Sequence, residues 1–159
     1  MDVFSCHRQS TDCLNQSQKS DMYIKLNLNP FGKEKGDCVI RAITLALNYN
    51  WFMVHDELSF LSRKMGDMPS SNEVWKTYLT RKGYKEEFVE NTCPDCLTVE
   101  GFARSHPKGR YILNTCEYTK ANNIIVTGTH VVTVIDGDYY DSWDSGADVP
   151  LSYFYIYDK

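Results

Sequence analysis

The feature that most constrains the fold is a change of sequence pattern near residue 109. Before it, apolar residues recur at helical spacing. The predicted helices run from 37 to about 48, from about 51 to 64, from 73 to 82 and from 98 to 106. After it, β-branched and aromatic runs alternate with turn residues. The predicted strands run over 110–115, 124–127, 130–135, 138–143 and 151–157. With a short first strand near 22–28, this order predicts an α+β fold, whose N-terminal helices pack on one side of a C-terminal antiparallel β-sheet.

Length and charge narrow the classes of protein further. The 159 residues fit one domain, which we place at 22–159, after a polar and flexible N-terminal arm at 1–21. The net charge of −4, without a cluster of Lys and Arg, predicts no nucleic-acid partner. No run approaches the roughly 18 apolar residues of a membrane span. Because the start has no signal-peptide pattern, we expect a cytoplasmic protein with its six cysteines reduced and no membrane partner.

Cys38 is the first candidate functional residue, because it lies where a helix is predicted to begin. Gly36-Asp37-Cys38 precedes an amphipathic run that ends at Leu47, and Asp37 is a favoured N-cap type. The free N–H groups and partial positive charge of a helix start lower a thiol pKa and stabilise an oxyanion. A buried structural cysteine has the same surroundings, so Cys38 alone does not separate the two interpretations.

His130 is the candidate partner of this thiol, at the head of a strand that turns at Asp136-Gly137. The other histidines fall in the N-terminal arm, on the surface of a predicted helix and at a helix end. A two-residue turn makes His130 and Asp141 diagonal neighbours on one face of the hairpin, with backbones roughly 7–8 Å apart. Asp141 then orients the imidazole, and Trp143 opposite His130 shields their hydrogen bond from water.

A three-residue turn is the alternative register of the same hairpin. It would place Asp144 opposite His130 and move Asp141 to the other face. We favour the two-residue turn and therefore Asp141.

Two further cysteines have the spacing of half a metal site. Cys93 and Cys96 would need two more ligands for structural zinc, and Cys6, His7 or Cys13 would have to supply them. The spacing of Cys6 and Cys13 is not a recurring ligand spacing. We therefore predict no metal ion and no organic cofactor.

Three motifs together resemble the papain-like cysteine peptidase superfamily, in its small bacterial and phage-encoded form. They are Gly36-Asp37-Cys38 at a helix start, His130 at a strand start, and Asp141-Ser142-Trp143 after a hairpin. The resemblance covers about residues 29–145. It implies a papain-like fold and a thiol hydrolase that cleaves an amide, isopeptide or thioester bond of a peptide or protein substrate. Cys38 would be the nucleophile, His130 the base and Asp141 the orienting acid.

One part of the family pattern differs in this chain. Papain-like enzymes usually carry a Gln before the nucleophile, which completes the oxyanion hole, and here Gly32 stands near that place. Asn29 is the candidate substitute, with Lys33 and Lys35 as alternatives.

Two other functions remain open from the sequence. The first is a phage or mobile-element protein that has the same fold and binds a host protein without using its triad. The aromatic residues 153–157 would then form a sheet edge that pairs with this partner. The second alternative function is that of a cell-wall amidase, and the absence of an export signal pattern disfavours it. The substrate, the choice between hydrolysis and acyl transfer, and the oligomeric state are not predicted.

Overall fold

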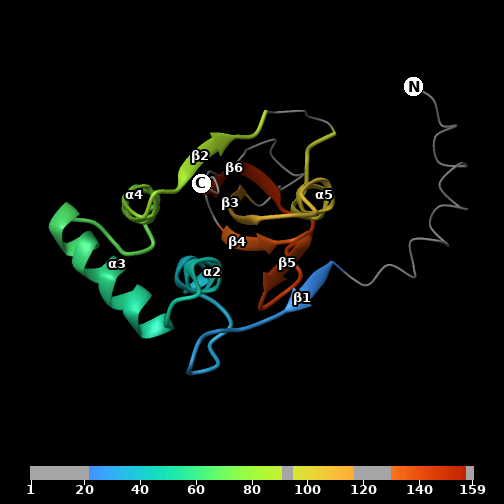
Figure 1. Ribbon diagram of the computed structural model, residues 1–159. Coiled ribbons are helices and arrows are strands. Elements are labelled where there is room, and N and C mark those ends of the chain that lie inside the picture. The colour runs from blue at the N-terminus through green and yellow to red at the C-terminus, as the bar shows by residue number, and fades with distance from the viewer. Residues whose placement is uncertain (1–21, 91–94, 117–129, 157–159) are drawn as a thin grey trace, which may run out of the picture.

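The computed structural model describes residues 22–90, 95–116 and 130–156. In these ranges the chain forms four helices and one six-stranded sheet, which confirms the predicted α+β class (Figure 1). The helices are α2 (Cys38–Leu47), α3 (Trp51–Met65), α4 (Asn72–Arg81) and α5 (Val99–Ser105). The strands are β1 (Tyr23–Lys25), β2 (Lys85–Phe88), β3 (Arg110–Cys116), β4 (His130–Ile135), β5 (Asp138–Asp141) and β6 (Val149–Tyr155). The predicted arm at 1–21 and the predicted strand at 124–127 lie outside the described residues.

The sheet is mixed, whereas the sequence pattern predicted an antiparallel sheet. Its strand order is β1-β5-β4-β3-β6-β2, and β1 pairs in parallel with β5 while the other pairs are antiparallel. β1 precedes the helices in the chain and is therefore not joined to β5 by a hairpin turn, so the two strands can pair in parallel. The edge on the other side is β2, which the sequence pattern missed because three of its four residues are charged.

The aromatic strand β6 does not form a sheet edge. It lies between β3 and β2, and the side chain of Phe154 is fully buried. The partner-binding edge that the sequence suggested at residues 153–157 is therefore wrong for the part of that segment that the structure describes.

Helices cover both faces of the sheet, which corrects the prediction that they pack on one side (Figure 1). The strands alternate their side chains between the faces. Val131 and Ile112 face the layer of α2, α3 and α4, whereas Val132 and Leu113 face α5. The short helix α5 buries Phe102 on this second face. That face also carries apolar side chains, and packing against α5 removes them from solvent.

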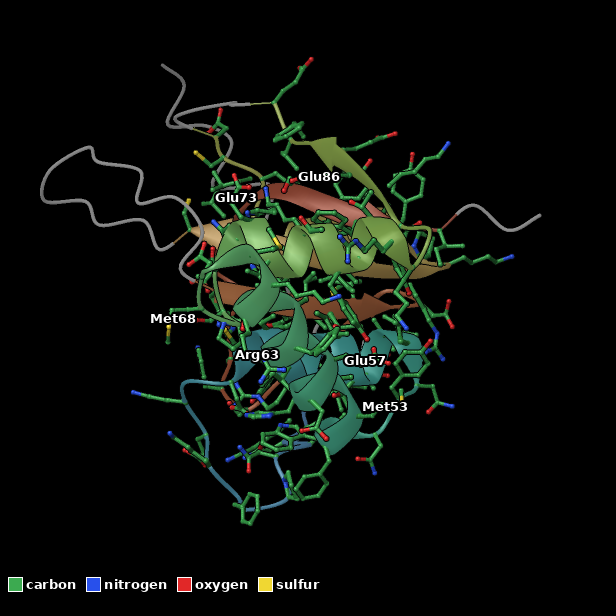
Figure 2. The ribbon with its side chains drawn as sticks, turned by 90° about the vertical axis from the view of Figure 1, so that its left-hand side faces the viewer. Met53, Glu57, Arg63, Met68, Glu73 and Glu86 are labelled. Atoms are coloured by element: carbon green, nitrogen blue, oxygen red, sulfur yellow. The ribbon has the colours of Figure 1, made fainter. Side chains whose placement is uncertain are left out.

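α3 forms the outer part of the larger helical layer, where it packs against α2 and α4. Figure 2 shows α3 and α4 in front of the sheet, and the side chains of Met53 and Met68 are exposed. Gly66 ends α3 in the left-handed conformation that glycine readily adopts at a helix C-terminus. No helix in the described ranges is long and apolar enough to span a membrane.

The hairpin of β4 and β5 has the predicted two-residue turn. Asp136 and Gly137 both have positive φ values, 50° and 87°, as a type I′ turn requires. Ile135 consequently pairs with Asp138, which confirms the predicted register. β4 begins at His130 and β5 ends at Asp141, so these two residues lie at the same, open end of the hairpin.

Candidate active site

Cys38 is the first residue of α2 and is partly buried. Its position is fixed by the packing of the helix on β4. Ile43 of α2 is fully buried, and the Thr133 hydroxyl of β4 donates a hydrogen bond of 2.7 Å to the carbonyl oxygen of Ala42. This packing places the start of the helix beside the open end of the hairpin.

A cleft of about 660 Å³ opens at this point, and Cys38 and His130 both line it. Its walls come from separate parts of the chain: Lys35 and Gly36 before α2, Ser70 and Asn72 at the start of α4, and Trp143 after β5. Cys38 thus lines the cleft, while its other side packs against the apolar cluster of the larger helical layer.

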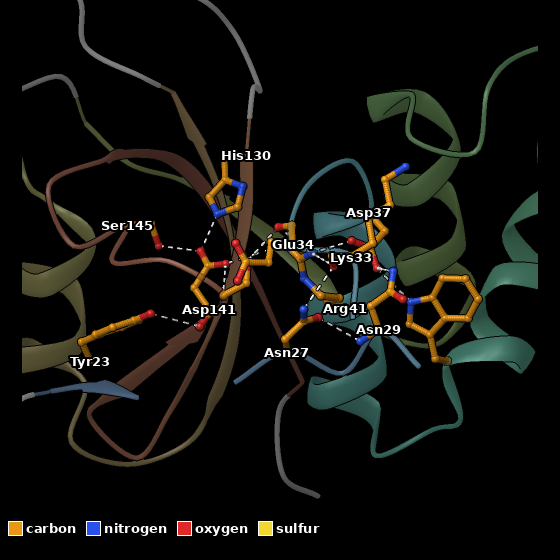
Figure 3. Close-up of polar contacts among 12 residues, drawn as sticks. Tyr23, Asn27, Asn29, Lys33, Glu34, Asp37, Arg41, His130, Asp141 and Ser145 are labelled. Carbon is orange, nitrogen blue, oxygen red and sulfur yellow. Dashed lines mark hydrogen bonds and ion pairs between the residues drawn. The ribbon is translucent and has the colours of Figure 1, made fainter. Parts of the chain in front are cut away.

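The imidazole of His130 is held by the carboxylate of Asp141. His130 Nε2 lies 2.5 Å from Asp141 Oδ2, and both side chains are buried (Figure 3). Asp141 also accepts hydrogen bonds of 2.7 Å from the Ser145 hydroxyl and from the backbone N–H of Ser142. Since Nε2 is used by Asp141, Nδ1 is the ring nitrogen left to face the thiol.

The thiol and the imidazole shift each other's protonation. Burial raises the pKa of Cys38, but the hydrogen bond and the charge of His130 outweigh it, with help from the Val131 N–H and from Arg41, so that the pKa is lowered. Burial lowers the pKa of His130, whereas hydrogen bonds to Asp141 and Cys38 raise it to about 9. Both shifts act in the direction of a thiolate–imidazolium pair.

Asp141, and not Asp144, is the carboxylate beside the imidazole. Asp144 accepts hydrogen bonds from the hydroxyl of Tyr139 at 2.6 Å and from the N–H of Gly146 at 3.0 Å. The ring of Trp143 lies against that of His130, with centroids 4.5 Å apart, as the two-residue turn predicted.

Asn29 has a structural place and does not line the cleft. Its amide nitrogen donates to the carboxylate of Asp37 at 2.8 Å, and its amide oxygen accepts from the N–H of Phe31 at 2.8 Å. Asp37 stands at the N-cap position without capping the helix by its side chain. We therefore do not assign Asn29 to the oxyanion hole, because it does not line the cleft and its amide helps to fix the loop before α2.

The sequence pattern missed two residues that contact the site. Arg41 lies 3.8 Å from Asp141 by its guanidinium, and Ser145 donates to the same carboxylate. Arg41 left a signal, since it is a charge inside the apolar run of α2. Ser145 left none, because a serine after a strand is ordinary in a turn.

The remaining candidates do not join the cluster. His55 is exposed on α3 and stacks on Trp51, and His106 ends α5 and stacks on Phe102. Cys93 lies outside the described residues together with Cys6, His7 and Cys13. No group of three possible metal ligands occurs in the part of the chain that the structure describes.

Comparison of the chain with protein-family models, with curated proteins and with solved structures gave no match. The site must therefore be interpreted from its own geometry.

Proposed function

We propose that this protein is a thiol hydrolase that cleaves an amide, isopeptide or thioester bond in a peptide or protein. The observation that carries the proposal is the cluster of Cys38, His130 and Asp141 at one end of a cleft, with the thiol pKa lowered by the imidazole. A papain-like fold of the small bacterial or phage-encoded type, and a cytoplasmic location that keeps the thiol reduced, are parts of the same proposal.

The first half of the reaction forms an acyl-enzyme. The Cys38 thiolate attacks the carbonyl carbon of the substrate, and the electron pair of the C=O bond moves to oxygen. The oxyanion then collapses, the bond to the leaving group breaks, and His130 gives its proton to a leaving amine. A thioester stays on Cys38. Asp141 holds the imidazole in the orientation that both transfers need.

The second half returns the enzyme to its starting state. A water molecule attacks the thioester while His130 takes its proton, and the thiolate leaves as the carboxylic acid is released. An amine in place of water would give acyl transfer by the same groups. Neither half requires a metal ion or an organic cofactor.

The helix start supplies a donor for the oxyanion. Backbone N–H groups in the first turn have no partner within the helix, and Cys38 is the first helical residue. Its own N–H therefore supports the proposal as one oxyanion donor. The second donor would have to come from the cleft, where the side-chain amide of Asn72 stands at the start of α4.

Selective labelling of Cys38 tests the proposal. A mild alkylating reagent, applied below the pH at which ordinary thiols ionise, should modify Cys38 before the other five cysteines. His130→Ala should abolish this selectivity, and His55→Ala, which removes an exposed imidazole, should preserve it. Uniform labelling of all six cysteines would instead support a binding protein with an unused triad.

Trapping identifies the substrate class in the same protein. A peptide or a ubiquitin-like protein that ends in an electrophile should form a covalent adduct, and mass mapping should place the adduct on Cys38. An adduct spread over several cysteines, or one that persists in Cys38→Ser, would contradict the assignment.

A further inference from the structure

Arg41 is a buried charge on the helix that carries Cys38. It lies between Ile40 and Ala42 in an apolar stretch of α2, and only 6% of it is exposed. Burial of a guanidinium costs free energy unless the charge is paired and hydrogen-bonded. The partners of Arg41 therefore indicate what the residue does.

One nitrogen of Arg41 ties α2 to the wall of the cleft. Nη1 donates to Asp37 Oδ1 at 2.5 Å and to the backbone carbonyl oxygens of Glu34 at 3.0 Å and Lys33 at 3.4 Å. These carbonyls directly precede Lys35 and Gly36, which line the cleft. Arg41 thus fixes the loop that forms one wall next to the thiol.

The other terminal nitrogen faces the orienting acid. Nη2 lies 3.8 Å from Asp141 Oδ1, the carboxylate oxygen that His130 does not use (Figure 3). This distance is that of an ion pair and is too long for a hydrogen bond. Nη2 has no hydrogen-bond partner among the described residues, so the ion pair with Asp141 is its polar contact, while the hydrogen bonds of Nη1 hold the planar group in place.

Little solvent separates these groups. Arg41, Asp141 and Cys38 line a small cavity of about 20 Å³, which has room for about one water molecule. The guanidinium also lies over the ring of Trp143, at 5.8 Å from the centroid. Charges in such a place interact more strongly than they would in bulk water.

We propose that Arg41 is a positioning residue of this site, which holds Asp141 against His130 and adds a positive charge at the small cavity that it lines together with Cys38. The inference rests on the proposed function, because it gives Arg41 a role toward the thiolate. The positive charge acts in the same direction as His130 on the pKa of Cys38, which it lowers. The other charged groups that face the cluster are Asp37 from the loop before α2, and Lys35 and Asp148 at the cleft.

The pH dependence of Cys38 alkylation tests this role. Arg41→Gln keeps hydrogen-bond donors for the loop carbonyls but removes the charge, so the midpoint of alkylation should move to higher pH. The rate measured below the original midpoint should fall several-fold. Arg41→Lys keeps the charge without the forked geometry and should restore part of the shift.

Arg110→Gln is the matched control. Arg110 ties the other end of α2 by hydrogen bonds to the carbonyl oxygens of Leu45 at 3.2 Å and Ala46 at 3.1 Å. Its loss should weaken the attachment of the helix and leave the alkylation midpoint unchanged. A midpoint that stays in place in Arg41→Gln would overturn the inference and leave only a structural role.

The same measurement separates this inference from the proposed function. An ordinary thiol midpoint in the unchanged chain contradicts the proposed function itself. A low midpoint that Arg41→Gln does not alter contradicts the role of Arg41 alone.

If both Arg41 variants fail to fold, the role of Arg41 can still be tested in the unchanged chain. The NMR signal of the Arg41 guanidinium should shift with pH at the midpoint of Cys38 alkylation, and this step should disappear in Cys38→Ala. A guanidinium signal that does not respond to the ionisation of Cys38 would overturn the inference.

Discussion

Asp141 is the residue through which the site is organised. Its carboxylate faces His130, Ser145, the Ser142 N–H and the guanidinium of Arg41, and it is buried. Every one of these neighbours is a donor or a cation, so Asp141 acts as the acceptor of the whole cluster. An isosteric amide keeps the shape but loses the charge and brings an N–H group toward a donor.

The first prediction follows from this arrangement. Asp141→Asn should lower the pKa of His130, because the hydrogen bond to Asp141 is the largest contribution that raises it. We expect Cys38 reactivity at neutral pH and turnover to fall by at least about tenfold. Asp144→Asn is the control, since Asp144 bonds Tyr139 and not His130. Equal losses in the two variants would contradict the assignment of the acid.

The protonation of His130 sets the alkaline limit of the reaction. For an amide substrate, kcat/KM should rise with formation of the Cys38 thiolate, at a pH below the ordinary thiol value, because the pKa is lowered. It should fall near pH 9, where His130 loses the proton that a leaving amine needs. A thioester substrate, whose leaving thiolate needs no proton, should show a weaker alkaline decline. The same decline for both substrates would contradict His130 as the proton donor.

At the scale of the elements, the packing of α2 on β4 decides whether thiol and imidazole meet. Ile43 is fully buried at this interface, five residues along the helix from Cys38. Ile43→Ala should lower the free energy of unfolding by about 2–5 kcal/mol, and Ile43→Val by about 0.5–1.5 kcal/mol. Urea unfolding would measure both values.

In these two variants, the reactivity of Cys38 should depend on the placement of α2 more than on the free energy of unfolding. Without denaturant, where both variants are folded, Cys38 labelling should lose selectivity in Ile43→Ala and retain it in Ile43→Val, because the cavity loosens the helix. Unchanged selectivity in a strongly destabilised Ile43→Ala would show that α2 does not set the geometry of the site.

The sequence predicts those elements whose signals are local. The turn at Asp136-Gly137 defines its own register, and that register brings His130 and Asp141 together. The start of α2 was likewise readable from Gly36-Asp37-Cys38. Both depend on neighbouring residues only, so no knowledge of the remaining fold is needed.

Features that depend on distant partners were not predictable. β2 is charged and becomes a strand only because β6 offers it an edge, with Glu87 accepting from the hydroxyls of Tyr153 and Tyr155. The position of α5 depends on which sheet face is left uncovered. Asn29 looked available for an oxyanion, yet its amide is used by Asp37, eight residues away along the chain.

At the scale of the molecule, the site joins two regions that are far apart in the sequence, residues 33–38 and the open end of the β4–β5 hairpin. The loop at 33–36, the start of α2 and the open end of the β4–β5 hairpin meet at one end of the sheet, on one side of the cleft. Ser142 strengthens this junction, since its hydroxyl donates to the carbonyl oxygen of Glu34 at 2.8 Å. Global unfolding therefore destroys the ion pair, and the pair must contribute to the pH dependence of stability.

The contributions of the two groups have opposite signs. The folded pKa of His130, about 9, exceeds the ordinary 6.5, so its contribution to stability is complete below pH 6.5 and is lost as the pH rises toward 9. Cys38 has a lowered pKa, so its contribution is present above the ordinary 9.0 and is lost as the pH falls through the folded value. Between pH 6.5 and 9, and above the folded pKa of Cys38, folding moves a proton from sulfur to imidazole, so the number of bound protons changes little.

Removal of the thiol should make the contribution of His130 to the pH dependence of the unfolding free energy measurable. Cys38→Ala keeps Asp141 beside the imidazole, so the variant should lose ~1–2 kcal/mol of unfolding free energy between neutral pH and pH 9, whereas the unchanged chain loses less. Chemical unfolding at a series of pH values measures this. A steeper loss in the unchanged chain than in Cys38→Ala would contradict the shared proton.

The most direct test of the thiolate–imidazolium pair is a pH titration of the Cys38 thiolate itself. Its ultraviolet absorbance is obtained as the difference between the unchanged chain and Cys38→Ser, and is followed again in the background of His130→Ala. We predict that the thiolate signal appears below the ordinary thiol pKa of 9.0, and that it moves to higher pH without His130. A signal that first appears near pH 9 in both backgrounds would contradict the pairing on which the proposed function depends.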